Sequence, residues 1–340
     1  MDCGTNSVRL LIADVGADGA VRDVVRRMRI VRLGEGVDRT GRLNPAALER
    51  TFTALRGYAD LIEAAGARHV RMCATSATRD AVNRDEFVRG VRNILGVEPE
   101  VVTGDEEAAL SFAGATAGVS GLEPPLLVVD IGGGSTEFVL GPALGDEGVL
   151  AAGSSGKEQP ALAALSVDIG CVRLTERHLA SDPPAPEQVA AAVRDIDAGI
   201  ALAAGRVPLT RAVTVVGLAG TVTTLAALAL QLPGYDPDAI HLSRLAAADI
   251  ERLTSQLLSA PAAERAALPV MHPGRVDVIG AGALILRQIV RHTGASEVVV
   301  SEHDILDGIA LSAARRARTA GASAPSAMGS DFNPDRSTDG

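Results

Sequence analysis

Residues 130–137, with the sequence DIGGGSTE, constrain the fold of this chain more than any other stretch. They follow residues 126–129, an apolar run typical of a buried strand. Three consecutive glycines let the backbone adopt positive φ and let another group approach it closely, and successive N–H groups in such a turn can hold an anion. Two carboxylates beside a bound phosphate suit a bridging Mg²⁺. The stretch is therefore either a phosphate loop or a glycine-rich hairpin with a surface acid at each end.

Residues 2–7, with the sequence DCGTNS, repeat this plan at the start of the chain. Each loop has an aspartate, then small flexible residues that include hydroxyls, then a strand-like run. The repeat favours the phosphate-loop interpretation, because two related halves would each point one loop at a shared cleft. The expected phosphate contacts are Gly4, Thr5, Asn6 and Ser7 in the first loop, and Gly132, Gly133, Gly134 and Ser135 in the second.

With these two loops, the chain resembles the exopolyphosphatase and guanosine pentaphosphate phosphohydrolase family (Ppx/GppA) in a short, two-domain form. The resemblance continues through residues 73–80, 103–110, 166–177 and 217–225, and so covers most of residues 1–315. It implies an α/β fold with two ribonuclease H-like lobes, of the actin, sugar kinase and Hsp70 ATPase type, around an interdomain cleft. We expect one lobe over residues 1–121, a second over residues 122–318, and a disordered tail over residues 319–340.

Three adjacent acids in residues 103–108 (TGDEEA) open an expected helix. Acids in a first helical turn often only complement the helix dipole. The family resemblance instead implies that one of them is the base that activates water. Aligned through the following alanine, Glu107 takes that place, with Glu106 and Asp105 as alternatives.

Two further stretches combine a strand end with hydroxyls. In residues 74–80 (ATSATRD), Arg79 is either a solvated arginine that follows an N-cap turn or a residue whose planar guanidinium binds phosphate oxygens. The resemblance implies the second role. In residues 217–224 (GLAGTVTT), Gly220 and Thr221 either let helix amides face an anion or provide tight strand–helix packing.

The resemblance implies that Asp130 and Glu137, together with Asp2, hold Mg²⁺ or Mn²⁺. The predicted reaction is metal-assisted, in-line attack of water that releases terminal orthophosphate from inorganic polyphosphate. Alternatives are a phosphatase for guanosine pentaphosphate (pppGpp) or short phosphate chains. From another class, the alternatives are a sugar or acetate kinase-like phosphotransferase, or a nucleotide-binding regulator. The acidic motif at residues 103–108, placed before the central strand, favours hydrolysis.

The net charge of −10 over 340 residues argues against nucleic acid as a partner. It also opposes polyphosphate binding, so local arginines, backbone amides and metal ions would have to overcome the overall field. No apolar run approaches the ~20 residues that cross a bilayer, and the start does not resemble a signal peptide. The cysteines match no zinc spacing, so a cytoplasmic location is expected, and the resemblance implies a homodimer.

Two segments carry separate expectations. The first loop begins almost at Met1, so either the assigned start is late, which we favour, or the first strand is shortened. Residues 141–165 are rich in Gly, Ala and Ser and are expected to form a long, mobile connection.

Overall fold

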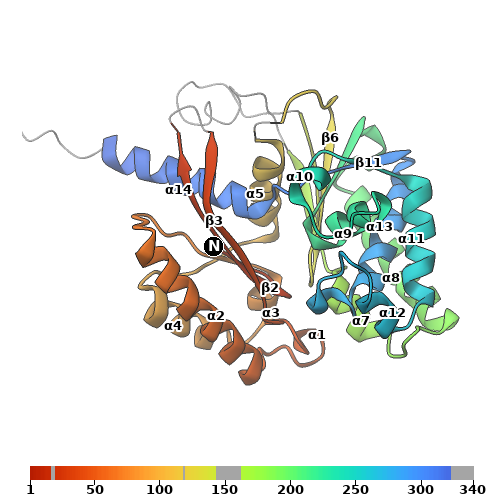
Figure 1. Cartoon of the computed structure of the whole chain (residues 1–340), viewed down its shortest axis with the longest axis horizontal. Coiled ribbons are helices and arrows are strands. Elements are labelled where there is room, and N and C mark those ends of the chain that lie inside the picture. The colour runs from red at the N-terminus through yellow and green to blue at the C-terminus, as the bar shows by residue number, and fades with distance from the viewer. Residues whose placement is uncertain (17–19, 118, 143–161, 323–340) are drawn as a thin grey trace, which may run out of the picture.

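The computed structural model describes residues 1–16, 20–117, 119–142 and 162–322, which form two lobes, each built on its own sheet. Figure 1 shows the N-terminal elements, from red to orange, on one side and the green and cyan elements on the other. The expected connection at residues 141–165 and the tail at residues 319–340 lie largely outside the described residues. The α/β architecture with two lobes is confirmed.

The N-terminal sheet has five strands in the order β3-β2-β1-β4-β5. Their bounds are β1 Asp2–Cys3, β2 Ser7–Val15, β3 Val21–Ile30, β4 Cys73–Ala74 and β5 Glu100–Val101. The helices of this part of the chain are α1 Val37–Thr40, α2 Pro45–Ala64, α3 Ser76–Asp80, α4 Arg84–Leu95 and α5 Gly104–Thr116.

Asn44 followed by Pro45 predicts the start of a helix, and helix α2 begins there. The Asn44 side chain accepts a hydrogen bond from the N–H of Ala46, and Pro45 occupies the first helical position, where its missing N–H costs nothing. The helix buries Leu48, Leu55 and other side chains in the core of this lobe.

The C-terminal sheet has six strands in the order β10-β11-β9-β6-β7-β8. Their bounds are β6 Leu126–Ile131, β7 Thr136–Gly141, β8 Ala163–Val167, β9 Thr214–Leu218, β10 Arg244–Ala246 and β11 Glu297–Val300. The helices are α7 Cys171–His178, α8 Pro186–Ala204, α9 Ala219–Ala229, α10 Pro237–Ile240, α11 Ala247–Ser259, α12 Ala262–Ala266, α13 Ile279–Thr293 and α14 Ile305–Ala322, with short 3₁₀ turns η1 Leu209–Arg211 and η2 Pro273–Arg275.

Strand β6 is apolar over its first four residues because both of its faces are covered. Leu126 and Val128 pack with Ala108 and Phe112 of α5 on one face. Leu127 belongs to the large core on the other face, which includes residues of α9 and α13. Strand β6 pairs antiparallel with β7 and parallel with β9 at the centre of the sheet.

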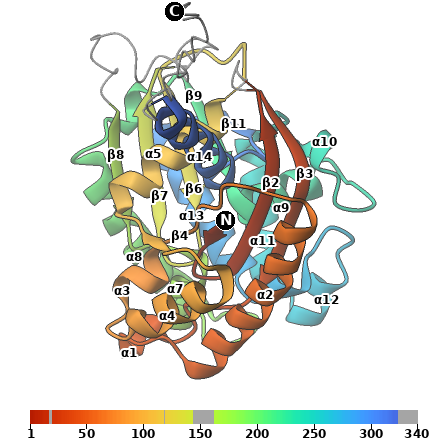
Figure 2. The ribbon, with the colours of Figure 1, turned by 90° about the vertical axis from the view of Figure 1, so that its left-hand side faces the viewer.

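Helices α5 and α14 pack against each other between the two sheets, as Figure 2 shows. Helix α5 comes from the N-terminal part of the chain but covers β6, β7 and β8. Helix α14 returns from the C-terminal part of the chain to pack on β2 of the first sheet. The boundary at residue 121 stays a prediction, and the two helices link the lobes across it.

Two element bounds differ from expectation. The sequence of residues 70–74 predicts a buried strand, but β4 is limited to Cys73–Ala74, because β1 pairs with it only through Asp2 and Cys3. Helix α14 continues to Ala322, past the expected end at residue 318. No helix in the described part of the chain combines the length and the apolar character that a bilayer span requires.

Candidate active site

The two glycine loops are hairpins closed by the same hydrogen bond. In the first, between β1 and β2, the N–H of Gly4 donates to the carbonyl of Ser7 at 2.9 Å. In the second, between β6 and β7, the N–H of Gly132 donates to the carbonyl of Ser135 at 3.0 Å. An aspartate precedes the glycine by two residues in each loop. The internal repeat seen in the sequence is therefore a structural repeat.

The lobes bring the two loops into contact. A Cβ atom added to Gly133 would lie 3.0 Å from Cβ of Thr5 and 3.2 Å from the backbone N of Asn6. A side chain at this position would force these neighbours to move by a few tenths of an ångström, so glycine suits the close approach. Together the loops line a cavity of about 110 Å³.

Most of the predicted site residues line this cavity. They are Asp2, Gly4, Thr5, Asn6, Ser7, Glu107, Asp130, Gly132, Gly133, Ser135, Glu137, Gly220 and Thr221. Among the described residues, the cavity lining does not include Arg79, Glu106 or Gly134. The sequence thus identified residues from both lobes that the fold gathers around one space.

The N-terminus of α7 supports the second loop from behind. The N–H groups of Cys171 and Val172 donate to the carbonyls of Gly132 and Gly133 at 3.0 and 2.8 Å. Gly170 packs against this loop so closely that an added Cβ would lie 2.3 Å from the carbonyl carbon of Gly133.

A Gly170→Ala substitution should therefore lower the free energy of unfolding by about 1–3 kcal/mol, because backbone atoms of the loop would have to move. Gly57→Ala in α2 is the matched control, since its Cβ would meet no atom within 4 Å. Alanine there should raise stability by about 0.5–1 kcal/mol. Urea unfolding midpoints of both variants check this. Equal effects of the two substitutions would contradict the packing argument.

Glu107 is the acid of residues 105–107 that reaches the cavity. Its side chain is buried, with 7% of the residue exposed, and Nη1 of Arg79 donates to its Oε2 at 3.0 Å. The same guanidinium nitrogen donates to the carbonyl of Val102 at 3.0 Å, which fixes Arg79 beside Glu107. Burial raises the pKa of Glu107 to about 7, against the opposing effect of Arg79.

Glu106 and Asp105 have other contacts. Glu106 is exposed and forms a capping box, in which its Oε2 accepts from the N–H of Thr103 at 2.9 Å and Oγ1 of Thr103 accepts from its own N–H at 3.2 Å. Asp105 pairs with Arg206 in solvent. The helical phase of α5 therefore points one carboxylate inward, which supports Glu107 as the candidate base.

A base with this pKa should give a pH-dependent reaction. Only the deprotonated carboxylate can accept a proton from water, so kcat/KM should fall about tenfold per pH unit below pH 7 and level off above it. A pH–rate profile between pH 5.5 and 9 at fixed free metal concentration measures this. A profile that is flat across pH 7 would contradict the role of Glu107.

The remaining carboxylates of the cavity are buried and hydrogen-bonded. Oγ of Ser111 donates to Oδ2 of Asp130 at 2.7 Å, and Oγ of Ser166 donates to Oε1 of Glu137 at 2.7 Å. Burial, reinforced by the nearby Asp304, raises the pKa of Asp130 to about 6. Burial and the charge of Glu107 also raise the pKa of Glu137. This concentration of carboxylates favours binding of a cation.

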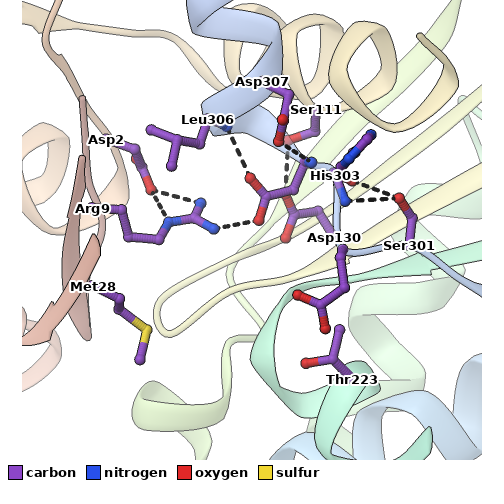
Figure 3. Close-up of polar contacts among 12 residues, drawn as sticks. Asp2, Arg9, Met28, Ser111, Asp130, Thr223, Ser301, His303, Leu306 and Asp307 are labelled. Atoms are coloured by element: carbon purple, nitrogen blue, oxygen red, sulfur yellow. Dashed lines mark hydrogen bonds and ion pairs between the residues drawn. The ribbon is translucent and has the colours of Figure 1, made fainter. Parts of the chain in front are cut away.

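Arg9 of β2 partly balances this charge, as Figure 3 shows. Its Nε and Nη2 donate to Oδ2 of Asp2 at 2.9 and 2.7 Å, and its Nη1 pairs with Asp304 at the start of α14. This role could not be predicted from the sequence, because the pattern of β2 does not show which groups its one arginine meets.

The oxygen atoms around the cavity fit a hard divalent cation. Oδ1 of Asp2 and Oδ1 of Asn6 are buried without a hydrogen-bond partner, and both residues line the cavity. Within the described ranges no three His, Cys, Asp or Glu side chains form a ready-made metal site. Protein oxygens would therefore supply only part of the coordination shell, as is usual for Mg²⁺, with phosphate oxygens and water completing it.

A second pocket, of about 520 Å³, adjoins the cavity. The two spaces share Arg9, Met28, Ala219, Gly220 and Arg275. Arg275 lies against the N-terminus of α9, where a Cβ on Gly220 would come within 2.3 Å of the guanidinium carbon. The sequence did not identify Arg275 as a site residue, since only the tertiary fold brings η2 to the N-terminus of α9.

Comparisons of the sequence and of the structure with known proteins point to the same family. The model of the Ppx/GppA phosphatase family matches residues 11–317. Exopolyphosphatase 2 of Mycobacterium tuberculosis is 50% identical over 326 residues, covering 92% of this chain and 97% of that protein. The crystal structure of an exopolyphosphatase-like protein superposes with a TM-score of 0.84 at 42% identity, covering 93% of this chain and 98% of the other. The Ppx/GppA family member of Aquifex aeolicus gives a TM-score of 0.72 at 30% identity, covering 93% and 96% of the two chains.

Proposed function

Because this chain belongs to the Ppx/GppA phosphatase family, we propose that it is an exopolyphosphatase that releases terminal orthophosphate from inorganic polyphosphate. The observation that carries the proposal is the common cavity of Glu107 and the two phosphate loops. A phosphoanhydride hydrolase needs positioned charge and an oriented water more than covalent chemistry. The cavity offers charged groups held in place and, in Glu107, a carboxylate that could orient the water.

In the proposed reaction, N–H groups of the two loops bind the oxygens of the terminal phosphate. Glu107 accepts a proton from water, whose oxygen forms the new bond to phosphorus. The anhydride P–O bond breaks in line with the attack, and the leaving phosphate keeps the bonding electron pair. Mg²⁺ or Mn²⁺ bound near Asp2, Asp130 and Glu137 would neutralise the charge that develops on these oxygens. Arg79 holds Glu107 in place through its 3.0 Å contact, and its direct contact with phosphate stays a prediction.

The size of the two spaces supports attack at a chain end. The small cavity between the loops accepts a terminal group, and the larger adjoining pocket offers Arg26, Arg27 and Arg275 to the rest of the chain. Arg26 is paired with Asp23 and Asp307, so Arg27 and Arg275 supply the local positive charge that a protein of net charge −10 needs to bind a polyanion.

One observation favours a second candidate substrate, guanosine pentaphosphate. The adjoining pocket also presents Met28, Tyr235 and Met271, whose apolar surfaces suit a nucleoside better than a phosphate chain. The cytoplasmic location and the homodimer stay predictions from the sequence.

Phosphate release from long polyphosphate, tripolyphosphate, guanosine pentaphosphate and ATP, assayed in parallel with Mg²⁺ and with Mn²⁺, tests the proposal. The highest kcat/KM is expected for a polyphosphate. A preference for guanosine pentaphosphate would move the assignment to the second candidate. Absence of release from all four would reject hydrolysis.

A further inference from the structure

A cluster of ion pairs joins the two lobes beside the second phosphate loop and outside the cavity. It consists of Arg173 and Arg177 from α7 and of Asp38 and Asp80 from the N-terminal lobe, and we call it the clasp. Arg177 donates to both carboxylate oxygens of Asp38, at 3.1 and 2.8 Å. Burial opposes ionisation of Asp38, but the hydrogen bonds from Arg177 and Arg173 outweigh it and hold its pKa below the ordinary value.

Arg173 is the centre of the clasp because its guanidinium has three different hydrogen-bond partners, besides a longer ion pair with Asp168 at 3.6 Å. Nη1 donates to Oδ1 of Asp38 at 2.6 Å, and Nη2 donates to Oδ2 of Asp80 at 2.6 Å. Nε donates to the carbonyl of Gly134 in the second loop at 2.7 Å. The side chain is only 11% exposed, so water screens these contacts weakly. A planar fork with several donors is the geometry that only arginine provides.

Gly134, like Gly133, lies where the second phosphate loop contacts the N-terminal lobe. A Cβ atom there would lie 2.5 Å from Oγ of Ser76 and 2.6 Å from Oγ1 of Thr5. Asp80 lies next in the chain to Arg79, which contacts Glu107. Through Gly134 and Asp80, Arg173 is thus connected to both phosphate loops and to the helix that holds the candidate base.

We propose that Arg173 is a positioning residue that keeps the cleft closed and fixes the second phosphate loop before substrate binds. Its catalytic consequence rests on the proposed function. Arg173 does not line the cavity and acts through its partners. It makes two separable contributions, because the aspartates lie on the opposite lobe and Gly134 lies on its own.

The ion pairs with Asp38 and Asp80 determine the fraction of molecules in which the cleft is closed. When they are lost, bound substrate still closes the cleft, so affinity falls with the closed fraction while the step after binding is preserved. A double Asp38→Asn, Asp80→Asn variant should therefore raise KM about tenfold, within the usual range of conformational coupling. Its kcat should stay close to that of the wild type.

The contact with Gly134 sets the position of the loop. An Arg173→Met variant loses this bond as well as the aspartates, so it should raise KM and also lower kcat, by about 10- to 100-fold. Arg173→Lys keeps a positive charge but cannot bridge the three partners, so it should lower kcat with a smaller change in KM. The lysine variant also provides a test if the methionine variant folds poorly.

The experiment measures kcat and KM for polyphosphate and hydrogen exchange of the free protein. Arg92→Met is the control, since Arg92 forms an exposed pair with Glu98 far along α4. Residues 4–7 and 132–135 should exchange several times faster in the double aspartate variant and in Arg173→Met than in the control. Unchanged kcat, KM and exchange in Arg173→Met would overturn the proposal, as would a loss of kcat in the double aspartate variant equal to that in Arg173→Met.

Hydrogen exchange separates this inference from the proposed function. If the wild-type protein does not hydrolyse polyphosphate, the exchange of the two loops still reports whether the clasp closes the cleft. Faster exchange in the variants would then support the role of the clasp and reject polyphosphate as the substrate. Unchanged exchange would reject the role of the clasp.

Discussion

A Glu107→Gln substitution is expected to lower kcat by about 10²- to 10⁴-fold, the usual loss when a general base is removed. Glutamine has nearly the same shape, and its amide oxygen can still accept the hydrogen bond from Arg79 that Oε2 accepts at 3.0 Å. It cannot accept a proton from water. The substitution therefore removes the proposed chemistry while the cavity and the phosphate contacts persist, so KM should change little.

Glu106→Gln is the matched control for this variant. The two residues are adjacent, and glutamine can replace glutamate in the capping box with Thr103, so helix α5 should be kept. Phosphate release from polyphosphate should be within about twofold of the wild type, since an exposed surface change has little effect. A Glu107→Gln variant with wild-type turnover, or an equal loss in Glu106→Gln, would contradict the assignment of the base.

An Asp130→Asn substitution is expected to reduce activity and raise stability together. Loss of the carboxylate would weaken the proposed metal binding, whose contribution of several kcal/mol corresponds to about 100-fold or more in rate. Asparagine also removes a buried charge. The ordinary pKa of 3.8 rises to about 6 in the folded protein, so the ionised carboxylate is less stable there than in the unfolded chain.

The effect of Asp130 on the free energy of unfolding should depend on pH. The wild-type protein retains the full contribution of protonated Asp130 below pH 3.8 and loses it as the pH rises through 6. Asparagine does not titrate, so the variant should be more stable than the wild type by about 1–3 kcal/mol at pH 8, with little difference near pH 4. Urea unfolding without metal at pH 8 and pH 4, with exposed Asp60→Asn as the control, measures this. A variant that is less stable than the wild type at pH 8 would contradict the account.

The sequence was most informative where a function needs a local pattern. Each proposed phosphate loop has an aspartate, a glycine and small hydroxyl residues within a few positions, and the repetition of that pattern predicted two loops that the structure places around one cavity. The N-terminus of α2 was equally predictable, because capping by Asn44 and Pro45 depends on adjacent residues alone.

The sequence could not show which groups meet across the fold. Glu107 and Glu106 are neighbours in an acidic turn, and only the packing of α5 against β6, β7 and β8 decides which of them is buried. Arg275 reaches Gly220 at the start of α9, and Arg173 reaches Gly134 of the second loop, each from a distant segment. The return of α14 to the first sheet was missed for the same reason, since a helix with one buried face gives no sign of which sheet it covers.

The most direct test of the central claim uses polyphosphate of defined length, with free ends and with both ends chemically blocked. If the cavity between the loops accepts a terminal phosphate, free-ended chains should release orthophosphate one unit at a time in the presence of Mg²⁺, and blocked chains should remain intact. Cleavage of blocked and free chains at equal rates, or products of intermediate length without orthophosphate, would contradict the claim that this cleft is built for chain ends.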